Sequence, residues 1–214
     1  PTYPKDRLMY MLEDSAAKLL IADRELLPLV DGYQGPVLFT DEIPQLEERD
    51  VELKKPELHD LFILLYTSGS TGVLKGCMLE YGNITAFCHW YKKYYHVDHS
   101  SKIAAYASFG FDASMMDIYG AIANGAELHI IPEEIRLDFI ALQRYFEENG
   151  VTHSFMTTQV GRQFAMEMSC ESLQYLSIGG EKLVPMEPPK DYKFFNAYGP
   201  TECTIFTTVF EVDK

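Results

Sequence analysis

Residues 66–76 form the segment YTSGSTGVLKG, which directly follows the apolar run 61–65. Glycines let the backbone approach a ligand closely, hydroxyl groups donate hydrogen bonds to phosphate oxygens, and Lys75 supplies a positive charge. Three glycines, two serines, two threonines and one lysine stand within these eleven residues, which is more than a turn needs. The segment therefore predicts a loop that binds a polyphosphate.

The main alternative for this segment is a solvated turn, because clusters of Ser, Thr and Gly commonly follow buried strands. The segment also differs from a Walker A loop. That motif places its lysine after the second glycine and directly before a Ser or Thr, whereas Lys75 stands before its glycine. A P-loop NTPase of the standard kind is excluded.

Two further polar segments also follow apolar runs. Asp112 lies in the segment FDAS, after the apolar run 103–107. It could simply cap a helix, or its carboxylate could bind a substrate ammonium group. Residues 196–202, NAYGPTE, follow the apolar run 193–195. They could form a mere turn, but they also combine a ring that can stack on a base with a hydroxyl group and a carboxylate suited to Mg²⁺.

Predicted strands and helices, which would position these polar segments, alternate along the chain. The pattern predicts an α/β fold with helices on both sides of a largely parallel sheet, whose ligands bind beyond the carboxyl ends of the strands. A charged linker at 41–60 predicts one subdomain over 1–60 and a second over 61–214. Helices are predicted at 6–14, 24–30, 81–96, 113–123, 137–149 and 160–168, and strands at 18–22, 37–39, 61–65, 103–107, 127–131, 152–156, 173–178 and 193–195.

Composition limits the possible partners. The 214 residues carry a formal charge of -14, so neither a nucleic acid nor an anionic membrane is expected as a partner. No apolar run approaches the roughly 20 residues that cross a bilayer, and no signal segment opens the sequence. The four cysteines are far apart, which predicts reduced thiols in a cytoplasmic protein rather than a zinc site or a disulfide framework.

The three polar segments, in this order and at these intervals, resemble the core motifs of the adenylate-forming (AMP-binding) superfamily. They are most similar to the amino-acid adenylation domains of nonribosomal peptide synthetases. The opening residues 1–15 also resemble a stretch of that family, so the likeness covers essentially the whole chain. A carboxylate–CoA ligase is less similar, because Asp112 within FDAS marks enzymes that bind an α-amino group.

The resemblance implies that an amino acid is activated by ATP to an aminoacyl adenylate and pyrophosphate, then transferred to a phosphopantetheine thiol on a carrier domain. Lys75, Thr201 and Glu202 would be catalytic, with Thr201 at the α-phosphate and Glu202 on Mg²⁺. The phosphate loop would comprise Thr67, Ser68, Gly69, Ser70, Thr71, Gly72 and Lys75. The rest of the nucleotide site would comprise Gly180, Glu181, Lys182, Asn196 and Tyr198, with Tyr198 stacked on adenine.

The resemblance also implies an amino-acid pocket with Asp112 at the α-ammonium group. None of the side-chain positions is charged, and burying an unpaired charge costs several kcal/mol. We therefore expect a neutral, mainly apolar substrate, such as a branched aliphatic amino acid. The side-chain positions are Ala113, Met116, Phe155, Ser177, Gly179, Ala197, Ile205 and Phe206.

Members of this family are longer at both ends, so the chain is expected to be an internal fragment of the N-terminal large domain, without the mobile C-terminal lid. Such a fragment should adenylate slowly or not at all, because the lid orients the reactants and excludes water. Two alternatives remain open. One is a stand-alone ligase that loads one amino acid, such as D-alanine, onto a carrier protein. The other is a catalytically inactive scaffold.

Overall fold

The computed structural model of the protein describes residues 3–47, 49–68 and 74–213. The chain divides into two compact units, Pro1–Pro56 and Glu57–Lys214. Within the described residues, no helix combines the length and the apolar character needed to cross a membrane.

The first unit is small and has little buried surface. Its two short strands pair in parallel, with Leu20 opposite Val37. Among its described residues only Val30 is fully buried. Its elements in chain order are α1 (Lys5–Asp14), β1 (Leu20–Ala22), the 3₁₀ helix η1 (Arg24–Val30), β2 (Val37–Phe39) and the 3₁₀ helix η2 (Thr40–Gln45).

The second unit contains most of the chain's secondary structure. Its strands are β3 (Leu61–Ser68), β4 (Leu74–Glu80), β5 (Lys102–Ala105), β6 (Glu127–Ile130), β7 (His153–Thr157), β8 (Tyr175–Gly179), β9 (Lys193–Tyr198) and β10 (Thr208–Glu211). Its helices are α2 (Tyr81–Tyr94), α3 (Ala113–Ile122), α4 (Phe139–Asn149) and α5 (Thr158–Glu167), with 3₁₀ turns η3 (Glu133–Ile135) and η4 (Thr201–Cys203).

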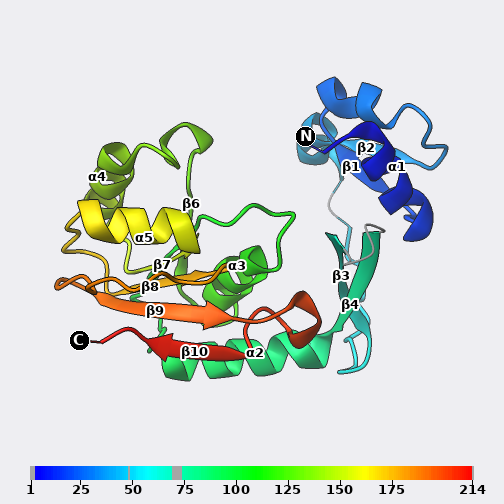
Figure 1. The fold of residues 1–214 in the computed structure, drawn as a ribbon. Coiled ribbons are helices and arrows are strands. Elements are labelled where there is room, and N and C mark those ends of the chain that lie inside the picture. The colour runs from blue at the N-terminus through cyan, green and yellow to red at the C-terminus, as the bar shows by residue number, and fades with distance from the viewer. Residues whose placement is uncertain (1–2, 48, 69–73, 214) are drawn as a thin grey trace. The chain divides into compact units, whose positions relative to one another are not determined.

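Six strands of this unit form one sheet in the order β10-β9-β8-β7-β5-β6. All neighbouring pairs are parallel except β9 and β10, which run in opposite directions, as the two lowest arrows in Figure 1 show. β3 and β4 pair separately as an antiparallel two-stranded sheet. The α/β class predicted from the sequence is confirmed.

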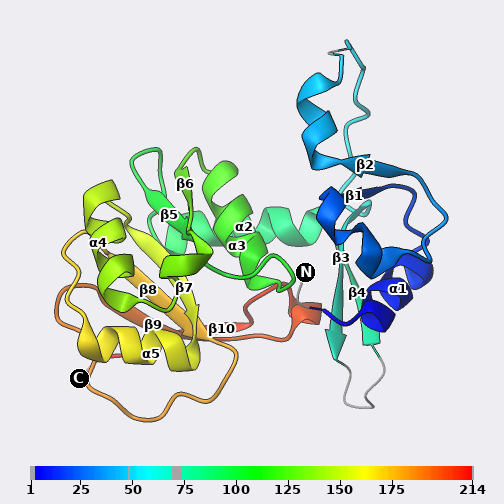
Figure 2. The ribbon, with the colours of Figure 1, turned by 90° about the horizontal axis from the view of Figure 1, so that it is seen from above.

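Two buried clusters cover the two faces of the six-stranded sheet. One joins α2 and α3 to side chains such as Ile103, Phe155 and Phe195. The other joins α4 and α5 to Met156 and Phe194, which stand next to Phe155 and Phe195 in the sequence. Successive strand residues thus point to opposite faces, as a pleated strand requires. Figures 1 and 2 show α4 and α5 on one side of the sheet and α2 on the other.

Local sequence signals account for the helices that flank the sheet. In α2, the buried residues Ile84, Phe87, Cys88 and Tyr91 repeat at helical spacing and form one apolar face. In α4, the Asp138 carboxylate caps the first turn by accepting a hydrogen bond from the Ala141 amide at 3.0 Å. Both helices were predicted from the sequence, α2 from this spacing of its apolar residues.

The largest difference from the sequence prediction concerns the hairpin. The strand predicted at 61–65 extends to Ser68, and 74–80, which the sequence left without a strand, forms β4. Lys75 therefore belongs to a strand and pairs across the hairpin with Thr67. A strand pair holds its residues by backbone hydrogen bonds, so both ends of the predicted loop have fixed directions.

Candidate functional site

A cavity of about 450 Å³ lies within the second unit, at the carboxyl ends of β5, β7, β8 and β9. β6 and β7 lie on opposite sides of β5, so the direction in which successive strands are added to the sheet reverses at β5. Parallel sheets bind ligands in the crevice at such a point. The cavity is lined by Tyr106, Ala107, Ser108, Phe111, Asp112, Ala113, Arg136, Phe155, Met156, Thr157, Gly179, Gly180, Glu181, Ala197, Gly199, Ile205 and Phe206.

The lining residues come from both faces of the sheet. Ala113, Phe155 and Ile205 belong to the buried cluster on the α2–α3 face. Tyr106 and Met156 belong to the cluster on the α4–α5 face. The cavity thus lies across the sheet edge, with an apolar compartment of Ala113, Phe155 and Ile205 on the α2–α3 face.

Asp112 stands at this cavity directly before α3, and its carboxylate has a partner far along the chain. The Thr201 hydroxyl donates to Asp112 Oδ2 at 2.6 Å, across 89 sequence positions. Burial raises the pKa of Asp112, the hydrogen bond from Thr201 lowers it, and the charge of Glu202 raises it. The net direction is upward. The segments FDAS and NAYGPTE, which the sequence singled out separately, therefore meet at one carboxylate.

This contact gives a testable pH dependence, if Asp112 binds an ammonium group only when ionised. Because its pKa is raised, the KM for the amino acid should increase as the pH falls through that raised value. Thr201→Val removes the hydroxyl that lowers the pKa, so the increase should begin at higher pH in this variant. Measuring the amino-acid KM from pH 5 to 9 for both proteins tests this. Identical pH profiles would show that Thr201 does not act on Asp112.

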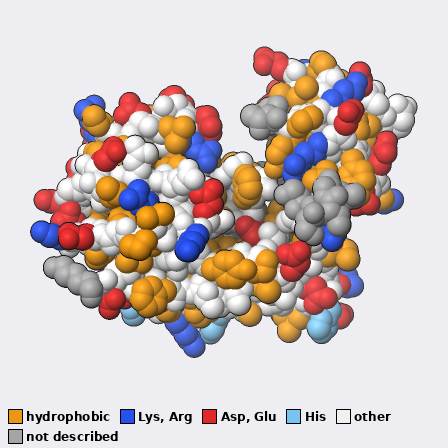
Figure 3. All heavy atoms as spheres, in the orientation of Figure 1, with side chains coloured by type: hydrophobic (Ala, Val, Ile, Leu, Met, Phe, Trp, Pro, Cys, Tyr) orange, Lys and Arg blue, Asp and Glu red, His pale blue; other side chains and the backbone are white. Residues whose placement is uncertain are grey.

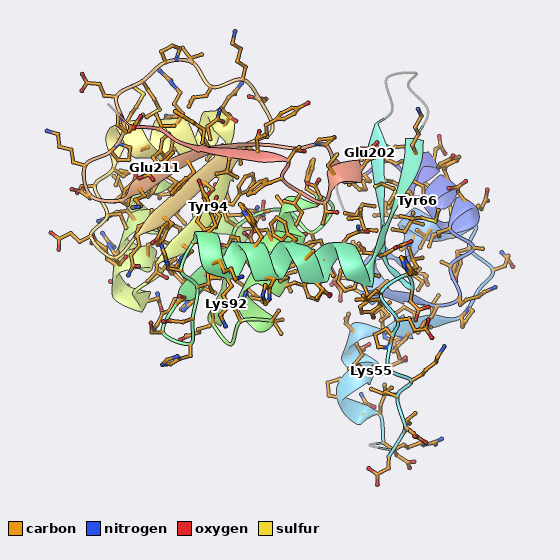
Figure 4. All side chains as sticks on the ribbon, turned by 90° about the horizontal axis from the view of Figure 1, so that it is seen from below. Lys55, Tyr66, Lys92, Tyr94, Glu202 and Glu211 are labelled. Carbon is orange, nitrogen blue, oxygen red and sulfur yellow. The ribbon has the colours of Figure 1, made fainter. Side chains whose placement is uncertain are left out.

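The turn that carries Glu202 lies against the hairpin. η4 packs on β4, and Figure 4 shows the labelled Glu202 beside the hairpin that carries Tyr66. Burial raises the pKa of the Cys77 thiol on β4, and the charges of Glu202 and Asp112 raise it further. An exposed carboxylate, a second carboxylate and the base of the predicted phosphate loop are thus close neighbours.

Part of the predicted phosphate loop can be placed. Lys75 is exposed on β4, and Thr67 opposite it is half-buried. Ser68 ends β3, and its side chain is not described. Gly69, Ser70, Thr71 and Gly72 lie outside the described residues. The hairpin therefore brings the start and the end of the loop together beside η4.

The other predicted nucleotide residues follow β8 and form or follow β9. Gly180 has a φ of +100°, a conformation that favours glycine. The next residue, Glu181, is fixed through its backbone, because its carbonyl accepts a hydrogen bond from the Thr158 hydroxyl at 3.1 Å. The Oδ1 atom of Asn196 is buried without a hydrogen-bond partner among the described residues. Lys182 and Tyr198 are exposed and do not line the cavity.

Two residues assigned to the amino-acid pocket do not line the cavity. Met116 is 2% exposed and packs in the same buried cluster as Phe155. The Ser177 hydroxyl donates to the Tyr95 hydroxyl at 2.9 Å inside the core. The seven other assigned residues do line the cavity: Asp112, Ala113, Phe155, Gly179, Ala197, Ile205 and Phe206.

The structure adds residues at the cavity that the sequence did not single out. Arg136 lines it and donates to the Tyr106 carbonyl, while the Tyr106 hydroxyl donates to the Arg136 carbonyl at 2.6 Å. Its guanidinium also pairs with Glu133 at 2.8 Å, which offsets part of its charge. Nothing near Arg136 in the sequence marks it, because the contact joins two separate strand exits.

Comparison with known proteins identifies the family. The model of the family described as "AMP-binding enzyme" matches residues 1–214. The chain belongs to this family of AMP-binding enzymes, and the assignment made from its motifs is confirmed.

Individual relatives are peptide synthases and adenylation domains. The chain is 40% identical over 220 aligned positions to surfactin synthase subunit 1 of Bacillus subtilis (strain 168), an alignment covering 99% of the chain and 6% of that protein. It is 35% identical to bacitracin synthase 1 of Bacillus licheniformis, covering 100% of the chain and 4% of that protein. The chain thus spans a small part of these relatives.

A solved structure shares the fold. The crystal structure of the Vibrio cholerae adenylation domain AlmE, in complex with glycyl-adenosine-5′-phosphate, matches with a TM-score of 0.80 at 21% identity. The match covers 97% of this chain and 46% of that one.

Proposed function

We propose that the protein activates an amino acid with ATP, forming an aminoacyl adenylate and pyrophosphate for transfer to a phosphopantetheine thiol on a carrier domain. The observation that carries this proposal is the 2.6 Å hydrogen bond between Thr201 and Asp112 at the edge of the cavity. It places a carboxylate suited to an α-ammonium group beside the turn of Glu202 and the hairpin of Lys75. An amino acid and a triphosphate would therefore meet head to tail.

Separate groups of residues would hold the two reactants. The compartment of Ala113, Phe155 and Ile205 would take the amino-acid side chain. Outside the residues that line the cavity, the buried Oδ1 atom of Asn196 on β9 has no hydrogen-bond donor among the described residues, and an adenine amino group could donate to it. Tyr198, 69% exposed on β9, would offer its ring to the base. Lys75 and the loop amides would offset charge as pyrophosphate leaves.

Glu202 is the candidate ligand for Mg²⁺. No group of three or more His, Cys, Asp or Glu side chains in the described part of the chain could hold a metal ion. Proteins commonly bind Mg²⁺ through one or two carboxylates together with the phosphates of the nucleotide. A single exposed carboxylate beside the hairpin fits that arrangement, and the ion would neutralise phosphate charge there.

The substrate is expected to be a neutral, mainly apolar amino acid. The cavity compartment on the α2–α3 face is built from Ala, Phe and Ile side chains, and an ionised side chain without a partner would cost several kcal/mol there. Arg136 also lines the cavity, but it already pairs with Glu133 and Tyr106. It therefore does not make the compartment a site for an acidic side chain.

Pyrophosphate exchange tests the proposed reaction. The full-length protein is incubated with ATP, labelled pyrophosphate and each of the twenty amino acids in turn. We expect amino-acid-dependent exchange that is highest for a neutral, apolar amino acid. Exchange that peaks with Asp, Glu, Lys or Arg would contradict the pocket assignment, and no dependence on any amino acid would contradict the reaction.

A further inference from the structure

Asp117 is buried in α3 and takes no part in the site described so far. It is 1% exposed and lies five positions after Asp112 in the sequence. Its Oδ2 atom accepts hydrogen bonds from the Tyr106 amide at 3.1 Å and the Ala107 amide at 3.0 Å. These are the first two residues after β5, and both line the cavity.

All described hydrogen bonding of this carboxyl group goes to the exit of β5. The other oxygen, Oδ1, is buried without a partner among the described residues. Burial raises the pKa of Asp117 to about 8, although the two amides and the Arg136 charge lower it. What this carboxyl group provides to the strand exit is an oxygen that accepts two hydrogen bonds.

The segment between the β5 exit and α3 has few other anchors. Phe109 and Phe111 are 61% and 63% exposed, so their rings add little buried surface. The Phe111 amide donates to the Ser108 carbonyl at 2.9 Å, a bond internal to the segment. At the start of the segment, the Tyr106 carbonyl accepts a hydrogen bond from the Arg136 guanidinium. The end of the segment is Asp112 itself.

Asp117 and Asp112 belong to the same stretch of chain, five residues apart along or beside one helix. At about 1.5 Å of rise per residue, this separation is a rigid length of about 7–8 Å. One end of that length binds the strand exit, and the other presents the Asp112 carboxylate. The two hydrogen bonds that Asp117 accepts thus tie the helix that follows Asp112 to the cavity wall, while the Thr201 hydroxyl donates to the Asp112 carboxylate itself.

We propose that Asp117 is a positioning residue for amino-acid binding, which holds the exit of β5 so that Asp112 and the wall of Tyr106 and Ala107 keep their places in the cavity. This rests on the proposed amino-acid activation. The role requires an acceptor oxygen at this position rather than a negative charge.

Three variants of the full-length protein separate this role from a general effect on stability. Asp117→Asn keeps an acceptor oxygen and should leave the amino-acid KM within about threefold of wild type. Asp117→Leu fills the space but leaves the Tyr106 and Ala107 amides without this acceptor, so the amino-acid KM should increase at least tenfold, with a smaller change in the KM for ATP. Met115→Ala, in the buried part of the same helix, controls for a loosened core and should not raise the amino-acid KM.

A second measurement does not depend on catalysis. Hydrogen–deuterium exchange of peptides covering 104–112 should accelerate in Asp117→Leu but not in Asp117→Asn. Asp117→Ser, whose shorter side chain cannot reach both amides, replaces the leucine variant if that does not fold. An asparagine variant as impaired as the leucine one, or a Met115→Ala variant with the same rise in KM, would overturn the proposal. If the wild-type protein shows no amino-acid-dependent pyrophosphate exchange, that result would instead count against the proposed function.

Discussion

Replacing Asp112 with Asn should reduce amino-acid-dependent pyrophosphate exchange about a hundredfold or more, mainly through the KM for the amino acid. The variant keeps the size of the side chain and an oxygen that can accept from the Thr201 hydroxyl, but it removes the negative charge. Breaking a partly buried, hydrogen-bonded charge pair costs about 2–5 kcal/mol, and each 1.4 kcal/mol is about tenfold. The nucleotide should still bind, because the variant keeps an acceptor for the Thr201 hydroxyl and the other proposed nucleotide contacts lie elsewhere.

The matched control for this variant is Asp138→Asn. Asp138 also precedes a helix, α4, but it does not line the cavity. We expect exchange within about twofold of wild type, and full steady-state kinetics in both substrates would show it. An Asp112→Asn protein with an unchanged amino-acid KM would falsify the assignment of Asp112 to the ammonium group.

The sequence predicted the fold class and the meeting of its motifs for one physical reason. Parallel strands end at the same edge of a sheet, so polar segments after successive strands must gather there. The family resemblance placed Asp112, Gly179 and Ala197 in one pocket, and all three line the cavity. The predicted roles of these residues stay predictions until substrate binding is measured.

Details that depend on side-chain packing could not be predicted in this way. Met116 stands four positions after Asp112, a spacing that puts the two on one helical face, yet it is buried in the core rather than exposed at the cavity. The strand β4 has no clean alternation of buried and exposed residues, with Met78 71% exposed. Its pairing with β3 is a contact between segments, which no local pattern reveals.

Asp117 did leave a signal that the sequence analysis did not use. It is an acidic residue on the otherwise apolar face of a predicted helix, where an unpaired charge would be costly. Such a residue must either be neutral or have partners, and here it has two backbone amides. Arg136 left no comparable signal, because it lies in a short polar turn. An acidic residue on an apolar helix face can thus be noticed in a sequence, whereas the backbone groups that bind it cannot.

The loop after β9 forms the last wall of the cavity and holds its backbone unusually close to Gly199. A Cβ atom at this glycine would lie 2.5 Å from the Ile205 carbonyl oxygen and 2.7 Å from both the Phe206 Cα and the Thr207 amide nitrogen. These are backbone atoms, which cannot rotate away as a flexible side chain could. The neighbouring Thr204 and Ile205 already have φ values of 62° and 72°, which cost energy for residues other than glycine.

Gly199→Ala should therefore displace Ile205 and Phe206 from the cavity wall and lower amino-acid-dependent exchange about a hundredfold. The Thr207 amide donates to the Tyr198 carbonyl at 2.8 Å, and that bond should lengthen, so peptides covering 199–207 should exchange deuterium faster. Gly125→Ala is the control. With a φ of +73° and open space around it, it should cost only about 1–2 kcal/mol of strain and leave exchange activity unchanged. Wild-type activity in Gly199→Ala would show that the wall tolerates displacement, and equal loss in both variants would show that lowered stability alone explains the effect.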